Sequence, residues 1–142
     1  MIQYPVEFNS KTTAQNGMQS EWETESKYGT TPVSIPPEFM GPGGSLSPED
    51  LFNHALANCF VATFKVYAEN SKVTFEALEV DSRLVVDLDE QKRPVMKELY
   101  LKAKIISPSH SEKALMLADK AFRSGFILNS VKTKCHFDFQ II

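Results

Sequence analysis

A single cysteine inside a predicted helix is the strongest candidate for chemistry in this chain. Residues 41–60, GPGGSLSPEDLFNHALANCF, join a glycine-rich run to a long apolar segment, with Cys59 about three turns inside the helix. A free cysteine at such a position is most often a small core residue, although its thiolate is a nucleophile. Because burial disfavours the thiolate, a reactive Cys59 would need a hydrogen-bond donor or a cation nearby. The neighbouring sequence supplies neither, so both interpretations stay open at this point.

Glu49 is the second candidate in the same segment. A carboxylate in the first turn of a helix stabilises the positive end of the helix dipole, but it can also orient a cation or a substrate. The helical rise places Glu49 about 15 Å from Cys59 along the axis. The two could therefore meet only through a break in the helix or an intervening partner. His54 is five residues before Cys59 and faces another side of the helix, so we do not expect it to act as the base.

The remaining chemically active residue types form no recognisable site. Cys135 continues an apolar strand face with Phe137 and Phe139, which favours a structural role. His136 points to the opposite face, so it and Cys135 cannot bind one metal ion from a regular strand. No group of cysteine, histidine and carboxylate residues has zinc-ligand spacing, and the loop 41–44 lacks the Lys-Ser/Thr ending of a P-loop. We expect no metal and no cofactor.

Composition indicates one ordinary globular domain over residues 1–142. Hydrophobic residues make up 42% of the chain and charged residues 23%. The net charge of −3 and the lack of a Lys/Arg cluster argue against nucleic acid as a partner. No apolar run reaches the length of a membrane span, and the N-terminus lacks the layout of a signal peptide. We therefore expect a cytoplasmic protein, in which both cysteines are free thiols.

The elements that precede Cys59 are predicted to be strands followed by one long helix. Apolar and polar residues alternate over residues 2–8, which predicts an edge strand because Pro5 cannot donate a hydrogen bond. The Asn16–Gly17 turn and the alternation over 18–25 predict a hairpin, and 30–37 predicts a short third strand. A helix should begin at Ser47-Pro48 and extend to about residue 70. It is apolar around most of its circumference, so we expect it to be buried nearly all round.

The second half is predicted to add two strands, a helix and a last strand. The strands lie over 75–88 and 98–105, the helix over 111–125 with Gly125 ending it as a C-terminal cap, and the last strand over 134–142. The first 45 residues contain no helix that could cover their apolar side chains. They must therefore pack on the second half of the chain or on another chain.

The helix motif resembles the OsmC/Ohr family of hydroperoxide-detoxifying proteins. The resemblance rests on LSPEDLF at residues 46–52 and ALANCF at 55–60, with the order of elements along the whole chain. It implies an α+β, OsmC-like fold, in which antiparallel sheets pack around a long buried central helix in an intertwined homodimer. It also implies that Cys59 attacks the peroxide O–O bond to become a sulfenic acid, and that Glu49 matches the glutamate of the family motif. A small hydroperoxide and an external thiol reductant would be the partners, without nucleic acid or membrane.

Two departures from the family pattern bear on activity. The family's resolving cysteine follows the second helix, where this chain has GFILNS at residues 125–130. The organic-hydroperoxide branch uses an arginine from the N-terminal strands, whereas every arginine here follows the long helix. Lys11 or Lys27 could replace that arginine, but neither has its planar fork of donors.

The sequence thus leaves two functions open. The first is an oxidative-stress redox protein, a thiol-dependent hydroperoxide reductase that uses Cys59 and an external thiol. The alternative is a non-catalytic OsmC-like dimer that binds a small apolar ligand.

Overall fold

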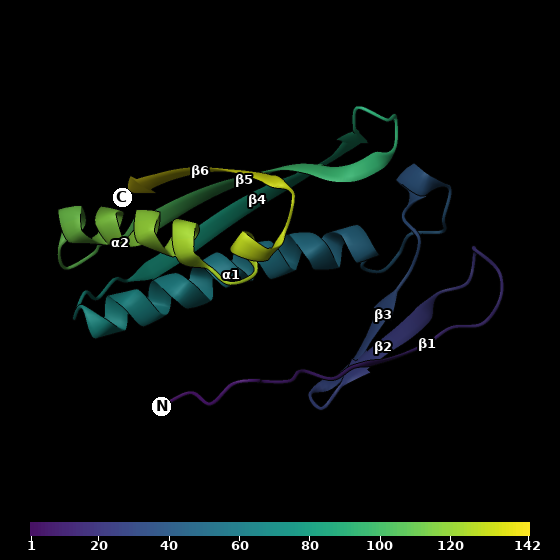
Figure 1. The fold of residues 1–142 in the computed structure, drawn as a ribbon, viewed down its shortest axis with the longest axis horizontal. Coiled ribbons are helices and arrows are strands. Elements are labelled where there is room, and N and C mark those ends of the chain that lie inside the picture. The colour runs from purple at the N-terminus through teal and green to yellow at the C-terminus, as the bar shows by residue number, and fades with distance from the viewer. The chain divides into compact units, whose positions relative to one another are not determined.

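A computed structural model describes the chain from residue 1 to residue 142. The chain divides into two compact units, residues 1–51 and residues 52–142 (Figure 1). The long helix α1 (Pro48–Asn70) begins in the first unit and continues in the second. The expectation of a single domain over 1–142 stays a prediction.

The first unit contains a three-stranded antiparallel sheet in the order β1-β2-β3. Its strands are β1 (Lys11–Thr13), β2 (Trp22–Ser26) and β3 (Gly29–Val33). The predicted hairpin around Asn16–Gly17 is present, because β1 pairs with β2 across this turn. The strand predicted over residues 2–8 is wrong: these residues are exposed and pair with no strand. A segment with alternating side chains forms a strand only when the backbone N–H and C=O groups of a neighbouring strand pair with its own.

The start of α1 follows the predicted capping pattern. The Ser47 hydroxyl accepts a hydrogen bond from the backbone N–H of Asp50 at 3.1 Å, and the Asp50 carboxylate accepts one from the backbone N–H of Ser47 at 2.9 Å. This reciprocal arrangement satisfies two N–H groups that a helix start would otherwise leave unpaired. A short 3-10 turn, η1 (Pro37–Phe39), and a glycine-rich loop lead into it.

The second unit is a three-stranded sheet with two helices. The sheet has the order β4-β5-β6, and its strands are β4 (Ala77–Leu88), β5 (Pro94–Ile106) and β6 (Lys134–Ile141). Helix α2 (Ser111–Ser124) and the short η2 (Leu128–Ser130) connect β5 to β6. The α+β class is confirmed. However, β5 and β6 pair in parallel, since a helical crossover joins them, and the expectation of antiparallel sheets did not include this pairing.

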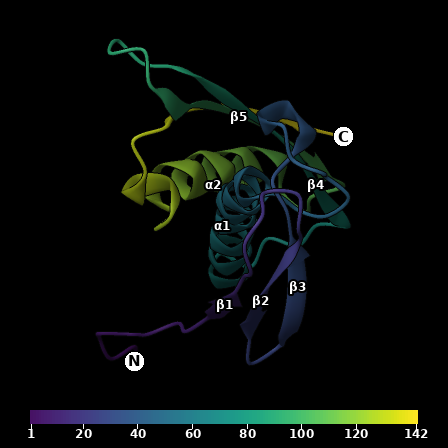
Figure 2. The ribbon, with the colours of Figure 1, turned by 90° about the vertical axis from the view of Figure 1, so that its right-hand side faces the viewer.

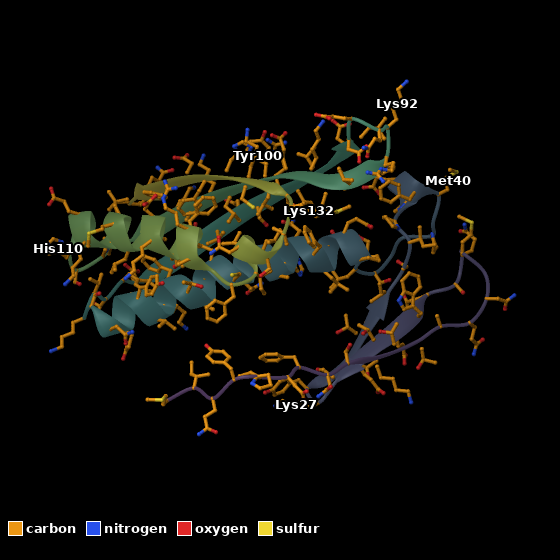
Figure 3. The ribbon with its side chains drawn as sticks, in the orientation of Figure 1. Lys27, Met40, Lys92, Tyr100, His110 and Lys132 are labelled. Carbon is orange, nitrogen blue, oxygen red and sulfur yellow. The ribbon has the colours of Figure 1, made fainter.

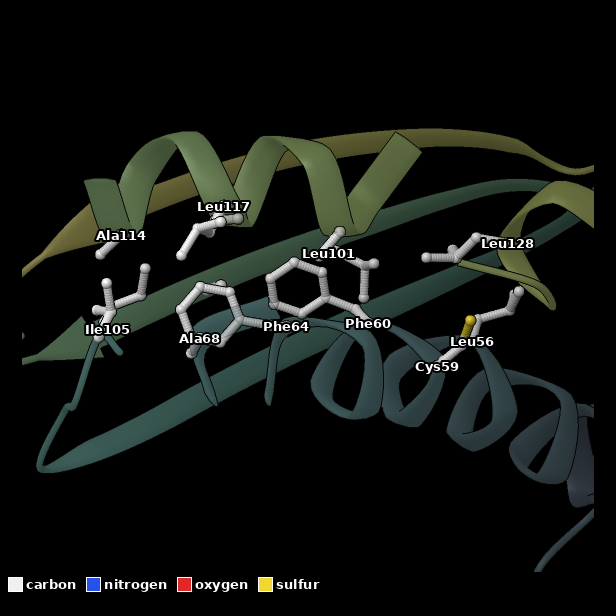
Figure 4. Packing of buried hydrophobic residues seen from close by; sticks show 14 of the residues in the cluster. Leu56, Cys59, Phe60, Phe64, Ala68, Leu101, Ile105, Ala114, Leu117 and Leu128 are labelled. Atoms are coloured by element: carbon white, nitrogen blue, oxygen red, sulfur yellow. The ribbon is translucent and has the colours of Figure 1, made fainter. Parts of the chain in front are cut away.

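Both helices of the second unit cover the same face of its sheet (Figures 1 and 2). Phe137 of β6 joins them, because its ring lies 4.7 Å from that of Phe60 in α1 and 4.8 Å from that of Phe122 in α2. Figure 4 shows the apolar layer between helices and sheet. The opposite face of the sheet carries polar and aromatic side chains such as Tyr100 (Figure 3).

Helix α1 is buried along one face within the chain. Its buried residues are Leu56, Cys59, Phe60, Phe64 and Ala68. Val66, which follows Cys59 by about two helical turns at the margin of this face, is 55% exposed. The expectation of burial nearly all round is therefore wrong for the single chain, because the sheet and α2 of the second unit cover only one side of the helix. No helix of the chain is both long enough and apolar enough to span a membrane.

Candidate functional site

Cys59 lies on the buried face of α1 with only 7% of its surface exposed. Its side chain points toward the turn that follows α2, where Leu128 lies (Figure 4). The thiol is free and, within the second unit, its sulfur takes part in no hydrogen bond. The structure thus places Cys59 at the edge of the core.

Gly125 is in direct contact with the Cys59 thiol. A Cβ atom at Gly125 would lie 2.7 Å from Cys59 Sγ and 3.2 Å from Leu128 Cδ1. The predicted role of Gly125 as a C-terminal cap is confirmed in part, because its N–H donates to the Ala121 carbonyl at the end of α2. Its φ of −61° is open to any residue, however, so this position does not require glycine for its backbone conformation. It requires glycine because the Cys59 sulfur occupies the space that a larger side chain would need.

The Cys59 thiol also borders a groove of about 320 Å³, called here the Cys59 groove. Its walls come from α1, from the last residue of α2 and from the turn that follows α2, and they are mainly apolar. The lining residues are Cys59, Ala62, Thr63, Val66, Tyr67, Ser124, Phe126 and Ile127. Phe126 is 77% exposed and Ile127 43% exposed, so this wall is open to solvent. A small apolar molecule could reach the thiol here without unfolding the chain.

Three hydroxyl groups supply polar side-chain atoms to this groove. Thr63 Oγ1 donates to the Cys59 carbonyl at 2.7 Å. Ser124 Oγ donates to the Lys120 carbonyl at 2.7 Å and lies 2.6 Å from the Tyr67 hydroxyl. The Lys120 ammonium lies 4.6 Å from the centre of the Tyr67 ring. These contacts fix the hydroxyl groups in place.

Glu49 lies in the first turn of α1, ten residues before Cys59 in the sequence. One of its carboxylate oxygens, Oε1, is buried and has no hydrogen-bond partner. A buried carboxylate oxygen without a hydrogen-bond donor is destabilising. His54 is exposed, and its carbonyl accepts a hydrogen bond from the Asn58 side chain at 2.8 Å.

Cys135 lies on the inner face of β6, beside Leu99 of β5. Burial raises the pKa of the Cys135 thiol, and its sulfur lies 3.5 Å from the Thr133 carbonyl. It borders a separate pocket of about 380 Å³ together with Leu128 and Arg123. A raised pKa makes the thiol less nucleophilic at neutral pH, which supports the structural role expected for Cys135.

The arginines of the second unit are engaged elsewhere. Arg83 stacks over the Tyr100 ring at 4.3 Å, on the outer face of the sheet. Arg123 pairs with Asp119 at 3.0 Å, and this contact raises the pKa of the Arg123 guanidinium. Arg93 pairs with Asp89 in the β4–β5 turn. Within this unit, then, no arginine lines the Cys59 groove.

Sequence reasoning missed the groove residues other than Cys59. Thr63 and Tyr67 follow Cys59 at intervals of four residues, so they share its side of the helix. That spacing was visible in the sequence, but it resembled an ordinary apolar stripe. The contact of Gly125 with the thiol depends on how α2 packs against α1, and no local pattern encodes it.

Comparisons with known proteins agree on one family. The model of the OsmC-like protein family matches residues 41–140. An OsmC-like protein of unknown function from Vibrio cholerae has a similar structure, with a TM-score of 0.83 and 17% identity over 97% of this chain and 100% of that one. The organic hydroperoxide resistance protein OsmC from Legionella pneumophila has a TM-score of 0.75 and 21% identity over 98% of each chain.

One sequence relative aligns with only part of this chain. The uncharacterized protein YmaD of Bacillus subtilis is 27% identical over 90 residues, which cover 63% of this chain and 60% of YmaD. The aligned stretch thus spans less than two thirds of that relative. The family model covers well over half of the present chain, and the chain therefore belongs to the OsmC-like family, which includes hydroperoxide resistance proteins.

Proposed function

We propose that the protein is a thiol-dependent hydroperoxide reductase in which Cys59 is the reacting group. One observation carries the proposal: the Cys59 thiol borders an apolar groove in a chain of the OsmC-like family. An apolar wall suits an organic peroxide, because it buries the hydrocarbon part while the O–O bond meets the sulfur.

The proposed reaction begins with attack of the Cys59 thiolate on the outer peroxide oxygen. An S–O bond forms and the O–O bond breaks, so the sulfur is oxidised to a sulfenic acid and the peroxide is reduced. The inner oxygen leaves as an alkoxide and takes up a proton to become an alcohol. The products are one alcohol and one sulfenic acid on Cys59.

The sulfenic acid is proposed to be reduced by an external thiol. Gly125, the residue in contact with the sulfur, carries no side chain, and burial raises the pKa of the Cys135 thiol. Both facts favour a reductant from solution. One external thiol would condense with the sulfenic acid, releasing water and forming a mixed disulfide, and a second would release Cys59 as a thiol.

Glu49 is the second proposed catalytic residue. Its buried Oε1 has no donor, which fits a carboxylate that binds a cation. In the proposed intertwined homodimer a lysine such as Lys11 or Lys27 would supply that cation. Sedimentation at micromolar concentration tests the assembly, and a stable monomer would contradict it.

The test of the reaction is peroxide consumption by the reduced protein with dithiothreitol present. We expect loss of cumene hydroperoxide well above the rate with dithiothreitol alone. Cys59→Ser should abolish the excess rate, and the matched variant Cys135→Ser should keep it. A rate that falls equally in both variants, or never exceeds the background, would contradict the proposal.

A second function, binding of a small apolar ligand without chemistry, is favoured by one specific observation. Within the second unit no donor and no cation contacts Cys59 Sγ, whereas the groove beside it is suited to an apolar molecule. Native mass spectrometry of the purified protein distinguishes this function. A co-purified apolar molecule in a protein that lacks peroxidase activity would support it.

A further inference from the structure

The pocket of about 380 Å³ beside Cys135, called here the Cys135 pocket, has no role in the proposed reaction. Its walls come from the end of α2, from η2 and from the segment that leads into β6. It shares no lining residue with the Cys59 groove. Its lining residues are Phe122, Arg123, Leu128, Asn129, Thr133 and Cys135.

Arg123 supplies the only charged side chain in the wall of the Cys135 pocket. Its Nε donates to both carboxylate oxygens of Asp119, at 3.1 and 3.0 Å. A guanidinium has five N–H donors, and within the second unit the four on the terminal nitrogens form no hydrogen bond. The pair with Asp119 therefore leaves donors available on a planar cation of the kind that binds carboxylates well.

Thr133 is the buried polar residue of the same wall. Only 9% of its surface is exposed. Its carbonyl accepts from the Cys135 thiol at 3.5 Å, but within the second unit its hydroxyl group forms no hydrogen bond. Hydroxyl groups at such a depth are normally paired, because an unpaired one is destabilising. A ligand in the Cys135 pocket would give the Thr133 hydroxyl a partner.

The apolar part of the wall is held in place by the core. Phe122 stacks on Phe137 at 4.8 Å, and Leu128 is buried. The side-chain amide of Asn129 donates to the Arg123 carbonyl at 2.9 Å, which joins η2 to the end of α2. The pocket thus combines a fixed apolar side with a cation and an unpaired hydroxyl group.

We infer that the Cys135 pocket binds short aliphatic carboxylates. The carboxylate would accept from the free guanidinium donors of Arg123 and from the Thr133 hydroxyl, since an ionised carboxyl group only accepts. The hydrocarbon part would pack on Phe122 and Leu128. A neutral amide of the same size would lose the charge-assisted part of this binding. The inference does not involve Cys59 and is independent of the proposed reaction.

The Cys135 thiol provides the readout, because it lies in the wall of the pocket. In the full-length Cys59→Ser protein it is the only thiol, and its alkylation at about pH 8 is followed by intact-protein mass spectrometry. Iodoacetate and iodoacetamide differ in charge, so the ratio of their rates measures attraction for a carboxylate. The thiol pKa cancels in this ratio. A synthetic peptide of residues 132–138 gives the reference, because it keeps the neighbouring charges without the pocket.

We expect the ratio of iodoacetate to iodoacetamide rates in the protein to exceed that in the peptide about five-fold, as for one exposed ion pair. Arg123→Gln should lower the ratio to that of the peptide, and Thr133→Val should lower it in part. Asp119→Asn should raise it, because a competing carboxylate is removed while the guanidinium stays. A loss of folding cannot produce that rise. Arg93→Gln is the matched control, since Arg93 also pairs with an aspartate four residues away, and it should leave the ratio unchanged.

Protection by an unreactive ligand tests binding itself. Propionate at millimolar concentration should slow the reaction of Cys135 with iodoacetamide. Propionamide, with sodium chloride added to match the ionic strength, should not. Equal ratios in protein and peptide, a ratio unchanged by Arg123→Gln, or no greater protection by propionate than by propionamide would overturn the inference. A protein that shows the expected selectivity yet never consumes peroxide would refute the proposed reaction alone.

Discussion

The contact between Gly125 and Cys59 makes Gly125→Ala an informative substitution. The new methyl group would lie 2.7 Å from Cys59 Sγ, closer than real Cβ contacts, so the thiol or the turn must shift. Such overpacking costs about 1–3 kcal/mol. Since φ is −61°, alanine adopts the backbone conformation without strain and restricts the unfolded chain, which returns about 0.4–1 kcal/mol. We therefore expect a net destabilisation of about 1.3 kcal/mol, the difference of the two midpoints, with about 2.6 kcal/mol as its upper limit.

The physical cause is tested by removing the sulfur. In a Cys59→Ala background the methyl group at position 125 would occupy space that the sulfur has left. Gly125→Ala should then be neutral or stabilising, and the double-mutant cycle should give a coupling energy of about 1–3 kcal/mol. The remaining contact, 3.2 Å to Leu128 Cδ1, requires only a small adjustment of a flexible side chain.

Urea denaturation of the wild type, Gly125→Ala, Cys59→Ala and the double variant measures the cycle. All four are compared at one protein concentration, because any self-association would make stability depend on concentration. The slope of the transition should stay the same in all four. If Gly125→Ala destabilised both backgrounds equally, the close approach of Gly125 to the thiol would be refuted.

Three further predictions concern groups around this site and on the outer face of the sheet. Because burial raises the pKa of the Cys135 thiol, Cys135 in a Cys59→Ser protein should react with iodoacetamide more slowly than free cysteine at about pH 8, and equal rates would contradict this. The His136 ring bonds to the Glu98 carboxylate at 3.1 Å and holds the pKa of Glu98 below its ordinary value. Because the pKa of Glu98 is lowered in the folded state, its charged carboxylate stabilises the fold at pH values above the ordinary pKa of the group. This stabilisation is lost as the pH falls through the lowered pKa. Glu98→Gln should thus reduce the urea midpoint more at about pH 7 than at about pH 3, and an equal loss at both values would refute the assignment. Finally, Gly125→Cys places a second thiol against Cys59, so mild oxidation should remove both thiols together; two persistent thiols would count against the geometry.

Much of the fold could be predicted because its signals are local. The start of α1 depends on Ser47 and Asp50, which cap the helix through contacts three residues apart. The strands β4 and β6 follow alternating side chains that face one layer of core. The strand expected over residues 2–8 failed because its alternation had no partner strand, and partner choice is a long-range property.

The candidate site was predictable in part. Cys59 was identified by its position in the helix motif, but its surroundings come from segments more than sixty residues later, such as Gly125. Packing of α2 against α1 decides which residues meet there, and no spacing in the sequence specifies it. The hydroxyl contacts of the groove likewise follow only from the three-dimensional structure, as between Tyr67 and Ser124.

The most direct test of the proposed reaction is a single turnover without a reductant. The reduced protein is mixed with one equivalent of cumene hydroperoxide, quenched, and analysed by intact-protein and peptide mass spectrometry with a reagent that labels sulfenic acids. The account predicts one added oxygen atom, located on Cys59, and one equivalent of alcohol released. An unmodified Cys59, or oxygen found first on Cys135, would contradict it.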